Sequence, residues 1–400
     1  MSMNIAYVLP TLFRGGAEKS TLFLASTMRA LGNDVTVTAI YEAGSLLDEI
    51  RSSGIPVYTK RNLRNLVKDH TPAAWLDLYY GAQVGRRRLQ YDRKVLLPPP
   101  DVEPSIERWT KERIRSIAPE IVHAHQSSCL DVMRWGRECG ARATVYTHHE
   151  MTGEVSDDDD LRRIRESIGW ADVATFGSEA QREDFLQRIP FPRERTCVIR
   201  PRTSFTGTPG QRYHKPPPLV LGMMNNLSPV KDPMTLLRAI QLLRDQGANL
   251  RLLIAGGDPR WKPVVKQVVR EWSLQSVVTF LGELRSDAEI QRFYDSIDVL
   301  VSTSVAESYS LVLTEAMECG VAVISTDVAS VNEHVTEGRT GLIFRKGNVD
   351  DLVSKIMFCL DHPGQIVEMG RRGREFAVNN LSGERTIVQY RKTYEQLLRG

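Results

Sequence analysis

The sequence predicts an α/β protein built from two parallel sheets, each wound on both sides by helices. Residues 4–40 have the pattern of a strand, a glycine loop, a helix and a second strand, which is how a doubly wound sheet begins. Strand and helix patterns alternate again over residues 219–344. Between these regions, residues 201–218 are poor in apolar side chains and rich in proline and glycine, which is typical of a linker. The chain is therefore expected to form two domains.

The linker sets the expected limits of these domains. An N-terminal domain is predicted over residues 1–200 and a C-terminal domain over residues 219–381, joined by residues 201–218. Residues 382–400 are predicted to form a final helix, because four apolar residues recur there at helical spacing: Ile387, Tyr390, Tyr394 and Leu397.

Composition excludes several classes of protein. A chain of 400 residues with 42% hydrophobic and 25% charged content is large enough for two cores. Its five scattered cysteines favour reduced thiols and a cytoplasmic location over a disulfide framework. Neither a signal peptide nor an apolar run of about 18 residues is present, so any membrane contact is expected to be peripheral, at the inner face. A net charge of +3 is too small to indicate a nucleic-acid partner.

A pair of glycines, Gly15 and Gly16, lies between the first predicted strand (4–9) and the first predicted helix (17–31). Glycine allows a ligand to approach the backbone closely, and the start of a helix offers N–H groups to an anion. The alternative is a plain turn, since the loop lacks the GxGxxG pattern of dinucleotide-binding proteins.

Two predicted strands end in histidines. Residues 120–125 end in His123-Ala-His125, and residues 142–149 end in His148-His149. His123 and His125 are expected on opposite faces of their strand, so that at most one faces a ligand. A metal pair would need a third ligand that the sequence does not offer, and histidines with structural hydrogen bonds are the alternative. No metal site is expected.

Two charged segments each allow two interpretations. Residues 156–160, SDDDD, resemble an Asp-x-Asp metal motif, but a serine followed by acids favours a capped helix start. Residues 60–115 are rich in basic residues interleaved with aromatics. That segment is either a solvated basic helix or a surface that meets an anionic acceptor or a membrane face.

The most informative stretch is residues 298–327. It has the pattern of a strand, a polar loop, a helix with Leu311, Leu313 and Met317 on its buried face, and another strand. Glu307 at the mouth of this helix and Glu315 near its middle are eight positions apart. Carboxylates accept hydrogen bonds from sugar hydroxyls, and the helix start offers N–H groups to a phosphate. Two solvated surface glutamates are the alternative.

Residues 307–323, ESYSLVLTEAMECGVAV, resemble the "Glu, seven residues, Glu" signature of the retaining GT-B glycosyltransferases, specifically glycosyltransferase family four (glycosyl transferases group 1). The resemblance covers almost the whole chain and is most specific over residues 219–345. It implies two Rossmann-like domains that face a central cleft. The first would bind the acceptor and the second a nucleotide-diphosphate sugar, with retention of configuration and without a metal or other cofactor.

The resemblance also implies roles for individual residues. Glu307 would contact the transferred sugar, Lys231 would neutralise the leaving diphosphate, and His125 would orient the sugar or phosphate. Glu315 would hold the nucleotide ribose. The remaining donor-binding candidates are Asn226, Ser308, Tyr309, Ser310, Leu311, Gly256 and Leu284, and the acceptor and phosphate loop comprises Gly15, Gly16 and His149.

One position departs from the family pattern. The family has an arginine and a lysine separated by four residues, with Asn226 and Lys231 at the corresponding positions here. An amide donates hydrogen bonds but carries no charge, so the leaving group should be stabilised less, or by another cation.

The resemblance leaves the acceptor open. It would be a glycan, a lipid-linked molecule or a small molecule. The alternatives to transfer are a nucleotide-sugar epimerase of the same fold and a catalytically degenerate nucleotide-sugar-binding protein, the latter indicated by Asn226.

Overall fold

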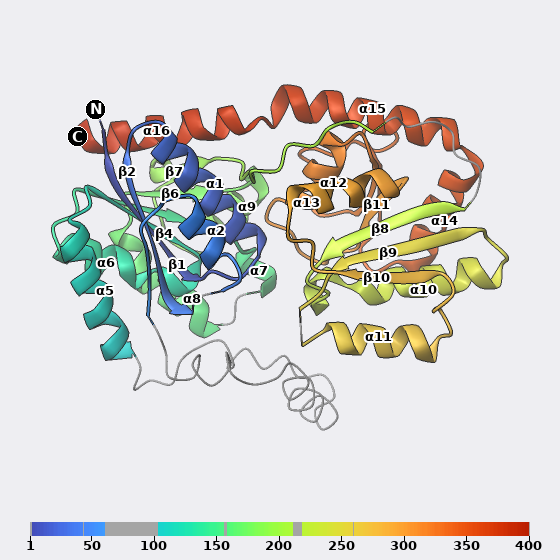
Figure 1. Cartoon of the computed structure of the whole chain (residues 1–400), viewed down its shortest axis with the longest axis horizontal. Helices are drawn as coiled ribbons and strands as arrows, with labels where there is room; N and C mark the ends of the chain where they lie inside the picture. The colour runs from blue at the N-terminus through green and yellow to red at the C-terminus, as the bar shows by residue number, and fades with distance from the viewer. Residues whose placement is uncertain are drawn as a thin grey trace. The chain divides into compact units, whose positions relative to one another are not determined.

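The chain forms two parallel α/β sheets. The computed structural model describes residues 2–42, 44–60, 103–155, 158–210, 218–258 and 260–399. Contacts divide it into unit 1, Met1–Ser204 with Gly383–Gly400, and unit 2, Phe205–Ser382. Each unit contains one sheet and its own core (Figure 1). The predicted fold class, two doubly wound parallel sheets, is confirmed.

The sheet of unit 1 has the strand order β3-β2-β1-β4-β5-β6-β7. Its strands are β1 (Asn4–Thr11), β2 (Asp34–Glu42), β3 (Val57–Thr59), β4 (Ile121–His125), β5 (Ala143–Thr147), β6 (Val173–Phe176) and β7 (Thr196–Val198). Its helices are α1 (Gly16–Ala30), α2 (Leu47–Ser52), α5 (Glu103–Ile117), α6 (Asp131–Glu138), α7 (Thr152–Val155), α8 (Asp158–Ser167), α9 (Glu179–Arg188) and α16 (Gly383–Arg399). The strand order reverses between β1 and β4, and parallel sheets bind ligands beyond the carboxyl ends of the strands at such a point.

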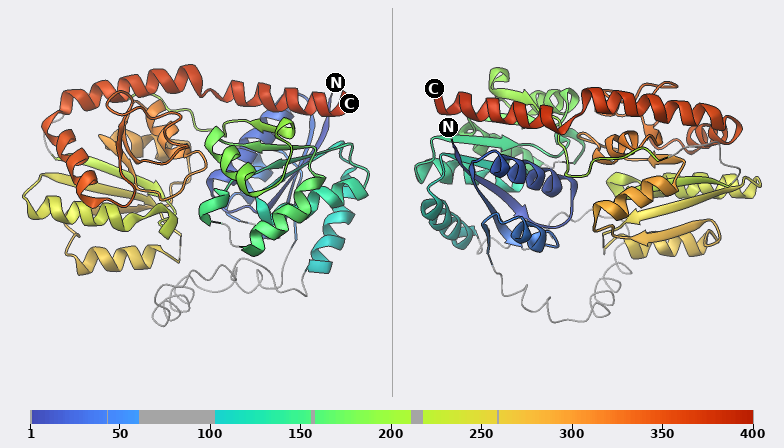
Figure 2. Two further views of the ribbon diagram at one scale, coloured as in Figure 1. Left: turned by 180° about the vertical axis from the view of Figure 1, so that it is seen from behind. Right: turned by 45° about the horizontal axis from the view of Figure 1, so that its top comes forward.

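Helices cover both faces of this sheet. On one face α1 and α16 pack against the strands, with Met28 and Tyr394 fully buried in the same cluster as Ile5. On the other face α6 and α9 contribute Met133 and Phe185 to a second cluster. Figure 2 shows α16 running along unit 1 beside the N-terminal strands. The last helix of the chain is therefore part of the core of the first unit.

The sheet of unit 2 has the strand order β10-β9-β8-β11-β12-β13. Its strands are β8 (Leu219–Asn225), β9 (Leu250–Gly256), β10 (Val278–Gly282), β11 (Val299–Ser302), β12 (Ala322–Thr326) and β13 (Leu342–Phe344). Its helices are α10 (Pro233–Asp245), α11 (Lys262–Glu271), α12 (Asp287–Ser296), α13 (Leu311–Glu318), α14 (Val349–Asp361) and α15 (Pro363–Asn380). Here the order reverses between β8 and β11.

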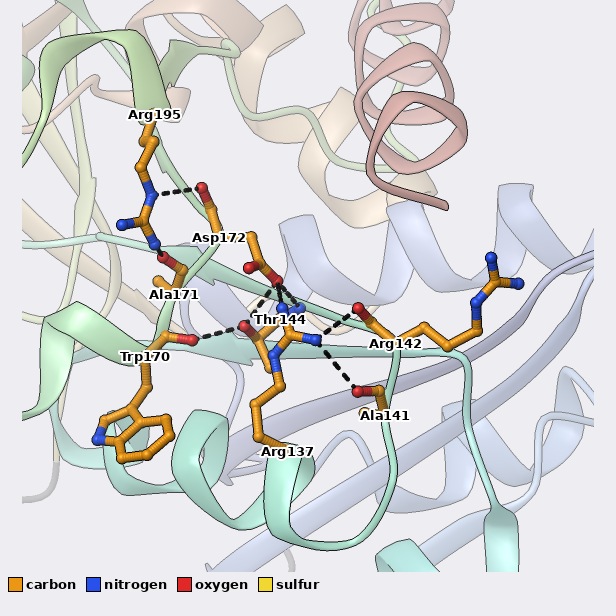
Figure 3. Close-up of polar contacts among 8 residues, drawn as sticks. All are labelled: Arg137, Ala141, Arg142, Thr144, Trp170, Ala171, Asp172 and Arg195. Atoms are coloured by element: carbon orange, nitrogen blue, oxygen red, sulfur yellow. Dashed lines mark hydrogen bonds and ion pairs between the residues drawn. The ribbon is translucent and has the colours of Figure 1, made fainter. Parts of the chain in front are cut away.

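At the amino end of each sheet, an aspartate accepts a hydrogen bond from the backbone of a neighbouring strand. In unit 1, Oδ2 of Asp172 accepts the backbone N–H of Thr144 at 2.7 Å and its hydroxyl at 3.0 Å, and it pairs with Arg137 (Figure 3). In unit 2, Oδ2 of Asp298 accepts the backbone N–H of Val220 at 2.8 Å. Each aspartate precedes a strand and satisfies a backbone donor at the start of the neighbouring strand, so both sheets are fixed at the same edge.

The segment around Glu307 and Glu315 differs from the prediction in one respect. Helix α13 begins only at Leu311, because Ser310 has a left-handed backbone with φ +69°. Glu307 therefore lies in the loop after β11 and not at the mouth of the helix. Leu313 is buried as predicted, whereas Leu311 is partly exposed because it is the first residue of the helix.

Two predictions fall largely outside the described residues. The basic segment 60–115 is described only at residue 60 and from residue 103 on, and the proposed helix cap at Ser156 is not described. No helix in the described part of the chain combines the length and apolar character needed to cross a membrane. All five cysteines are free thiols.

Candidate functional site

The donor-binding candidates of unit 2 follow the carboxyl ends of adjacent strands. Asn226 and Lys231 follow β8, Gly256 ends β9, Leu284 follows β10, and residues 307–311 follow β11. Because these strands are parallel neighbours, their loops meet at one edge of the sheet. At the reversal of strand order, between β8 and β11, the tertiary structure joins Lys231 to Glu307, which are 76 positions apart in the sequence.

Glu307 and Lys231 are in direct contact. Oε1 of Glu307 accepts a hydrogen bond from Nζ of Lys231 at 2.7 Å and another from the Ser304 hydroxyl at 2.7 Å. The backbone carbonyl of Glu307 accepts the Ser330 hydroxyl at 2.6 Å. The carboxylate side chain is 8% exposed and the lysine side chain 26% exposed. The pair therefore presents a more accessible ammonium group beside a carboxylate that neighbouring hydroxyls hold in place.

Backbone contacts fix the two loops that carry this pair. The Thr303 hydroxyl lies 3.0 Å from the carbonyl of Lys231 and 2.7 Å from that of Asp232. The N–H of Val305 donates to the carbonyl of Val230 at 2.8 Å. The loop after β8 and the loop after β11 are therefore joined by one main-chain bond and by the Thr303 hydroxyl, which together hold Lys231 near Glu307.

Helix α13 starts without a side-chain cap. Ser310 occupies the cap position in its left-handed conformation, and its side chain accepts no hydrogen bond from the first turn. The first N–H groups of a helix lack partners within the helix and favour negative charge nearby. One turn into the helix, Glu315 is 5% exposed and accepts the Tyr294 hydroxyl at 3.1 Å. Burial and the neighbouring Glu315 charge hold the pKa of Tyr294 well above its usual value, so this phenol remains a donor.

Asn226 has a structural role in its loop. Its Oδ1 accepts the N–H of Ser228 at 3.1 Å, and its carbonyl accepts the N–H of Asp258 at 2.9 Å. Leu227, between Asn226 and Ser228, has φ +59°. Asparagine forms such side-chain turns readily, so this residue supports the loop between β8 and Lys231, and it adds no charge there.

The histidines of unit 1 correct one prediction. His123 and His125 do not lie on opposite faces of β4, because residues two positions apart on a strand point to the same side. Their rings stack with centroids 4.1 Å apart. His149, in the loop after β5, stacks on His125 from a neighbouring position, with centroids 5.4 Å apart. The three rings form one stack at the carboxyl edge of the sheet.

His125 is neutral and only one of its ring nitrogens is engaged. Nδ1 lies 3.0 Å from the Thr21 hydroxyl and 3.1 Å from Nε2 of His149. Nε2 is buried and has no hydrogen-bond partner within the described part of the chain. Burial, together with His123 and His149, holds the pKa of His125 well below its usual value, and burial lowers that of His149 to about 4. His125 therefore offers a neutral ring nitrogen and no positive charge.

Two polar residues beside His125 were not among the predicted site residues. Gln126 has φ +68°, an uncommon conformation for a residue with a side chain, and its Nε2 donates to Oε1 of Glu18 at 3.0 Å. A Cβ at Gly15 would lie 2.3 Å from Oε2 of Glu18, so the Glu18 carboxylate lies against the glycine loop. Burial raises the pKa of Glu18. Glu18 directly follows Gly15-Gly16-Ala17, and this position could have marked it as a site residue. Nothing in the sequence indicates the conformation of Gln126.

Glu150 is a further titratable group at this edge. It follows His149, accepts that residue's backbone N–H at 3.3 Å, and lies 3.7 Å from Nδ1 of His148. Burial raises the pKa of Glu150 to about 7. The described residues include no group of three or more His, Cys, Asp or Glu side chains placed to hold a metal ion.

Family comparisons match both units. A model of Glycosyltransferase Family 4 matches residues 14–201, and a model of Glycosyl transferases group 1 matches residues 210–376. A D-inositol 3-phosphate glycosyltransferase of Corynebacterium glutamicum is 25% identical over 312 residues, covering 72% of this chain and 74% of that protein. An N-acetyl-alpha-D-glucosaminyl L-malate synthase of Bacillus anthracis is 30% identical over 151 residues, covering 38% of this chain and 39% of that protein.

Solved structures match the fold along almost the full length. Anabaena Alr3699/HepE in complex with UDP-glucose aligns with a TM-score of 0.76 and 19% identity, covering 98% of this chain and all of that one. Sucrose-phosphate synthase from Thermosynechococcus elongatus aligns with a TM-score of 0.77 and 17% identity, covering 99% of each chain. The predicted GT-B fold is confirmed.

Proposed function

The chain belongs to the glycosyl transferases group 1 of glycosyltransferase family 4, and we propose that it transfers a sugar from a nucleotide diphosphate to an acceptor hydroxyl, retaining the anomeric configuration and using no metal ion. The acceptor is a glycan, a lipid-linked molecule or a small molecule. The observation that carries this proposal is the contact between Lys231 and Glu307 beside the uncapped start of α13.

Each of these groups has a task on the donor side. Departure of the diphosphate builds negative charge on the leaving group and positive charge on the sugar, so the site must favour both. Lys231 and the first N–H groups of α13 are suited to the leaving phosphates. Glu307 accepts hydroxyls of the transferred sugar, and Glu315 accepts the ribose hydroxyls. The ion pair with Glu307 fixes the position of the Lys231 ammonium group.

The acceptor side uses the neutral histidine stack. A neutral imidazole at His125 can accept or donate a hydrogen bond and carries no positive charge. The family is usually assigned a same-face attack in which the leaving phosphate helps to remove the acceptor proton. His125 then orients the sugar or phosphate, and Gly15 and Gly16 allow close approach of the backbone.

The first donor to test is a uridine diphosphate sugar, because the related HepE structure contains UDP-glucose. A thermal-shift panel of uridine, guanosine and adenosine diphosphate sugars identifies the donor, since a ligand that binds only the folded protein raises its melting temperature. Transfer is then measured with and without a chelator. The proposal expects one nucleotide sugar to stabilise the protein and the transfer rate to be unchanged by the chelator. Failure of every nucleotide sugar to raise the melting temperature would contradict it.

A second candidate function is a nucleotide-sugar-binding protein without catalysis, favoured by the uncharged Asn226. Asn226→Arg tests whether the missing charge limits transfer. If the missing charge limits leaving-group stabilisation, turnover rises; a fall in turnover shows that the asparagine is needed for the loop that its bond to Ser228 supports. Donor binding without transfer across an acceptor panel, or conversion of donor to an epimer without acceptor, would exclude the transferase in favour of a binder or an epimerase.

A further inference from the structure

The C-terminal helix α16 reaches into the sheet core of unit 1 beside the histidine stack. The hydroxyl of Tyr394 lies 2.7 Å from Nδ1 of His123, and the other ring nitrogen, Nε2, lies 2.6 Å from the Thr147 hydroxyl. His123 and Tyr394 are both fully buried. Both ring nitrogens of His123 therefore have a partner, and one of the two partners comes from a residue 271 positions later in the chain.

Two further tyrosines extend this contact. Tyr390, one turn earlier on α16, places its hydroxyl 3.3 Å from the hydroxyls of Thr147 and Thr175. The Tyr7 hydroxyl on β1 lies 3.3 Å from that of Tyr394. This polar network lies inside an otherwise apolar core, where buried polar groups are costly unless they are hydrogen-bonded. A purely structural attachment of α16 could use apolar side chains, as Ile387 does.

His123 is linked to the site through ring stacking. Its ring lies 4.1 Å from that of His125 at an interplanar angle of 30°. Nδ1 of His125 is engaged by Thr21 and His149, whereas its Nε2 is buried and has no hydrogen-bond partner among the described residues. If the ring of His123 rotates, the stacked ring of His125 rotates with it, and the direction of Nε2 of His125 changes.

We propose that Tyr394 is a positioning residue for His125: its hydroxyl fixes the ring of His123, and that ring fixes the ring of His125. The C-terminal helix thereby takes part in shaping the acceptor side of the site. The part of this inference that concerns catalysis rests on the proposed function, whereas the part that concerns ring orientation does not.

The test compares Tyr394→Phe with a matched control on the same helix. Tyr394→Phe keeps the aromatic packing and removes only the hydroxyl, which leaves Nδ1 of His123 without its partner. The control is Thr386→Val, which removes a 2.8 Å hydrogen bond from α16 to the Arg200 carbonyl and touches none of the histidines. Tyr390→Phe is a second variant, expected to have a smaller effect because the hydroxyl of Tyr390 contacts His123 only through Thr147.

Three readouts separate positioning from stability. The first is the set of imidazole signals in nitrogen-15 NMR spectra of histidine-labelled protein, where the signals of His123 and His125 should shift in Tyr394→Phe and not in Thr386→Val. The second is kcat/KM for the acceptor, which should fall by about 10- to 100-fold in Tyr394→Phe, as expected when a reacting group is misplaced. The third is the melting-temperature rise with donor, which should change far less than kcat/KM, because Lys231, Glu307 and Glu315 lie in unit 2.

Unchanged His125 signals in Tyr394→Phe, or an equal loss of kcat/KM in Thr386→Val, would overturn the inference. If Tyr394→Phe does not fold, Tyr390→Phe decides by the same three readouts. A protein that neither binds donor nor transfers sugar would refute the proposed function and leave the NMR comparison intact, so the two failures are distinguishable.

Discussion

The amino and carboxyl edges of the two sheets are built in opposite ways. At the amino edge, Asp172 and Asp298 accept backbone N–H groups of neighbouring strands, and Asp172 also pairs with Arg137 (Figure 3). At the carboxyl edge, Gln126 and Ser310 have left-handed backbones, and Nε2 of the buried His125 lacks a partner among the described residues. The two aspartates at the amino edge thus satisfy backbone donors, whereas the carboxyl edge contains a buried ring nitrogen without a partner among the described residues.

This difference indicates where stability and where function reside. Satisfied buried hydrogen bonds stabilise the folded state, and a partner removed from such a bond costs stability. Strained backbones and unsatisfied polar groups cost stability, and they concentrate where ligands supply the missing contacts. Substitutions at the carboxyl edge should therefore affect activity more than stability, and substitutions at the amino edge the reverse.

The largest effect is expected for Glu307→Gln. The amide keeps the size of the side chain and removes the charge that faces Lys231 and the transferred sugar, so transfer should fall by about 100- to 1,000-fold. Nucleotide affinity, measured by calorimetry, should change only a few fold. Glu337→Gln is the control, because Glu337 forms an ion pair with Lys355 outside the proposed site. Equal losses of transfer and of nucleotide binding would contradict the assignment of Glu307 to the sugar.

Glu315→Ala should weaken nucleotide binding. If this carboxylate holds the ribose hydroxyls, the binding free energy should decrease in magnitude by about 1 to 3 kcal/mol. Tyr294→Phe keeps the ring and removes only the hydroxyl that donates to Glu315. It should have a smaller effect in the same titration. Unchanged affinity in Glu315→Ala would reject its role.

Asp172→Ala should act on stability alone. The substitution leaves the N–H of Thr144 and the guanidinium of Arg137 without their shared acceptor, so the free energy of unfolding should fall by about 1 to 2 kcal/mol in urea titrations. Activity per folded molecule should be unchanged. A loss of kcat without loss of stability would contradict the expectation that substitutions at the amino edge affect stability more than activity.

The smallest effect is expected in the pH dependence of stability. The pKa of Glu150 is raised by burial to about 7, above its ordinary value, so the folded state binds a proton more tightly than the unfolded state. The contribution of this group is fully present below the ordinary pKa of a glutamate, about 4.3. It is lost as pH rises to about 7. Glu150→Gln should flatten the fall in melting temperature over that interval, and an unchanged slope would show that Glu150 ionises normally.

Much of the donor side could be predicted from the sequence because its signals are local. The strand, loop and helix pattern around Glu307 and Glu315 lies within 30 consecutive residues, 298–327. The prediction that Glu307 lies at the mouth of the helix was wrong because Ser310 adopts a left-handed backbone and α13 begins at Leu311, which local propensity does not predict for serine. That Lys231 contacts Glu307 depends on strands β8 and β11 being neighbours.

The acceptor side depends more on long-range contacts. The two histidine pairs were visible as strand endings, but the stacking of His149 on His125 depends on the pairing of β4 with β5. The polar network of His123 depends on a helix that is contiguous in sequence with unit 2 and packs in unit 1. Such contacts join residues that are far apart in the chain, and neither periodicity nor composition predicts them.

By itself, the sequence determined the alternation of strands and helices, the two doubly wound sheets and the family, because apolar periodicity and short motifs are encoded between near neighbours. Only the tertiary structure decided which loops meet at the carboxyl edges, that Lys231 pairs with Glu307, and that Tyr394 lies against His123. These depend on the order of the strands and on the packing of the last helix in unit 1, and burial then lowers the pKa of His123, His125 and His149.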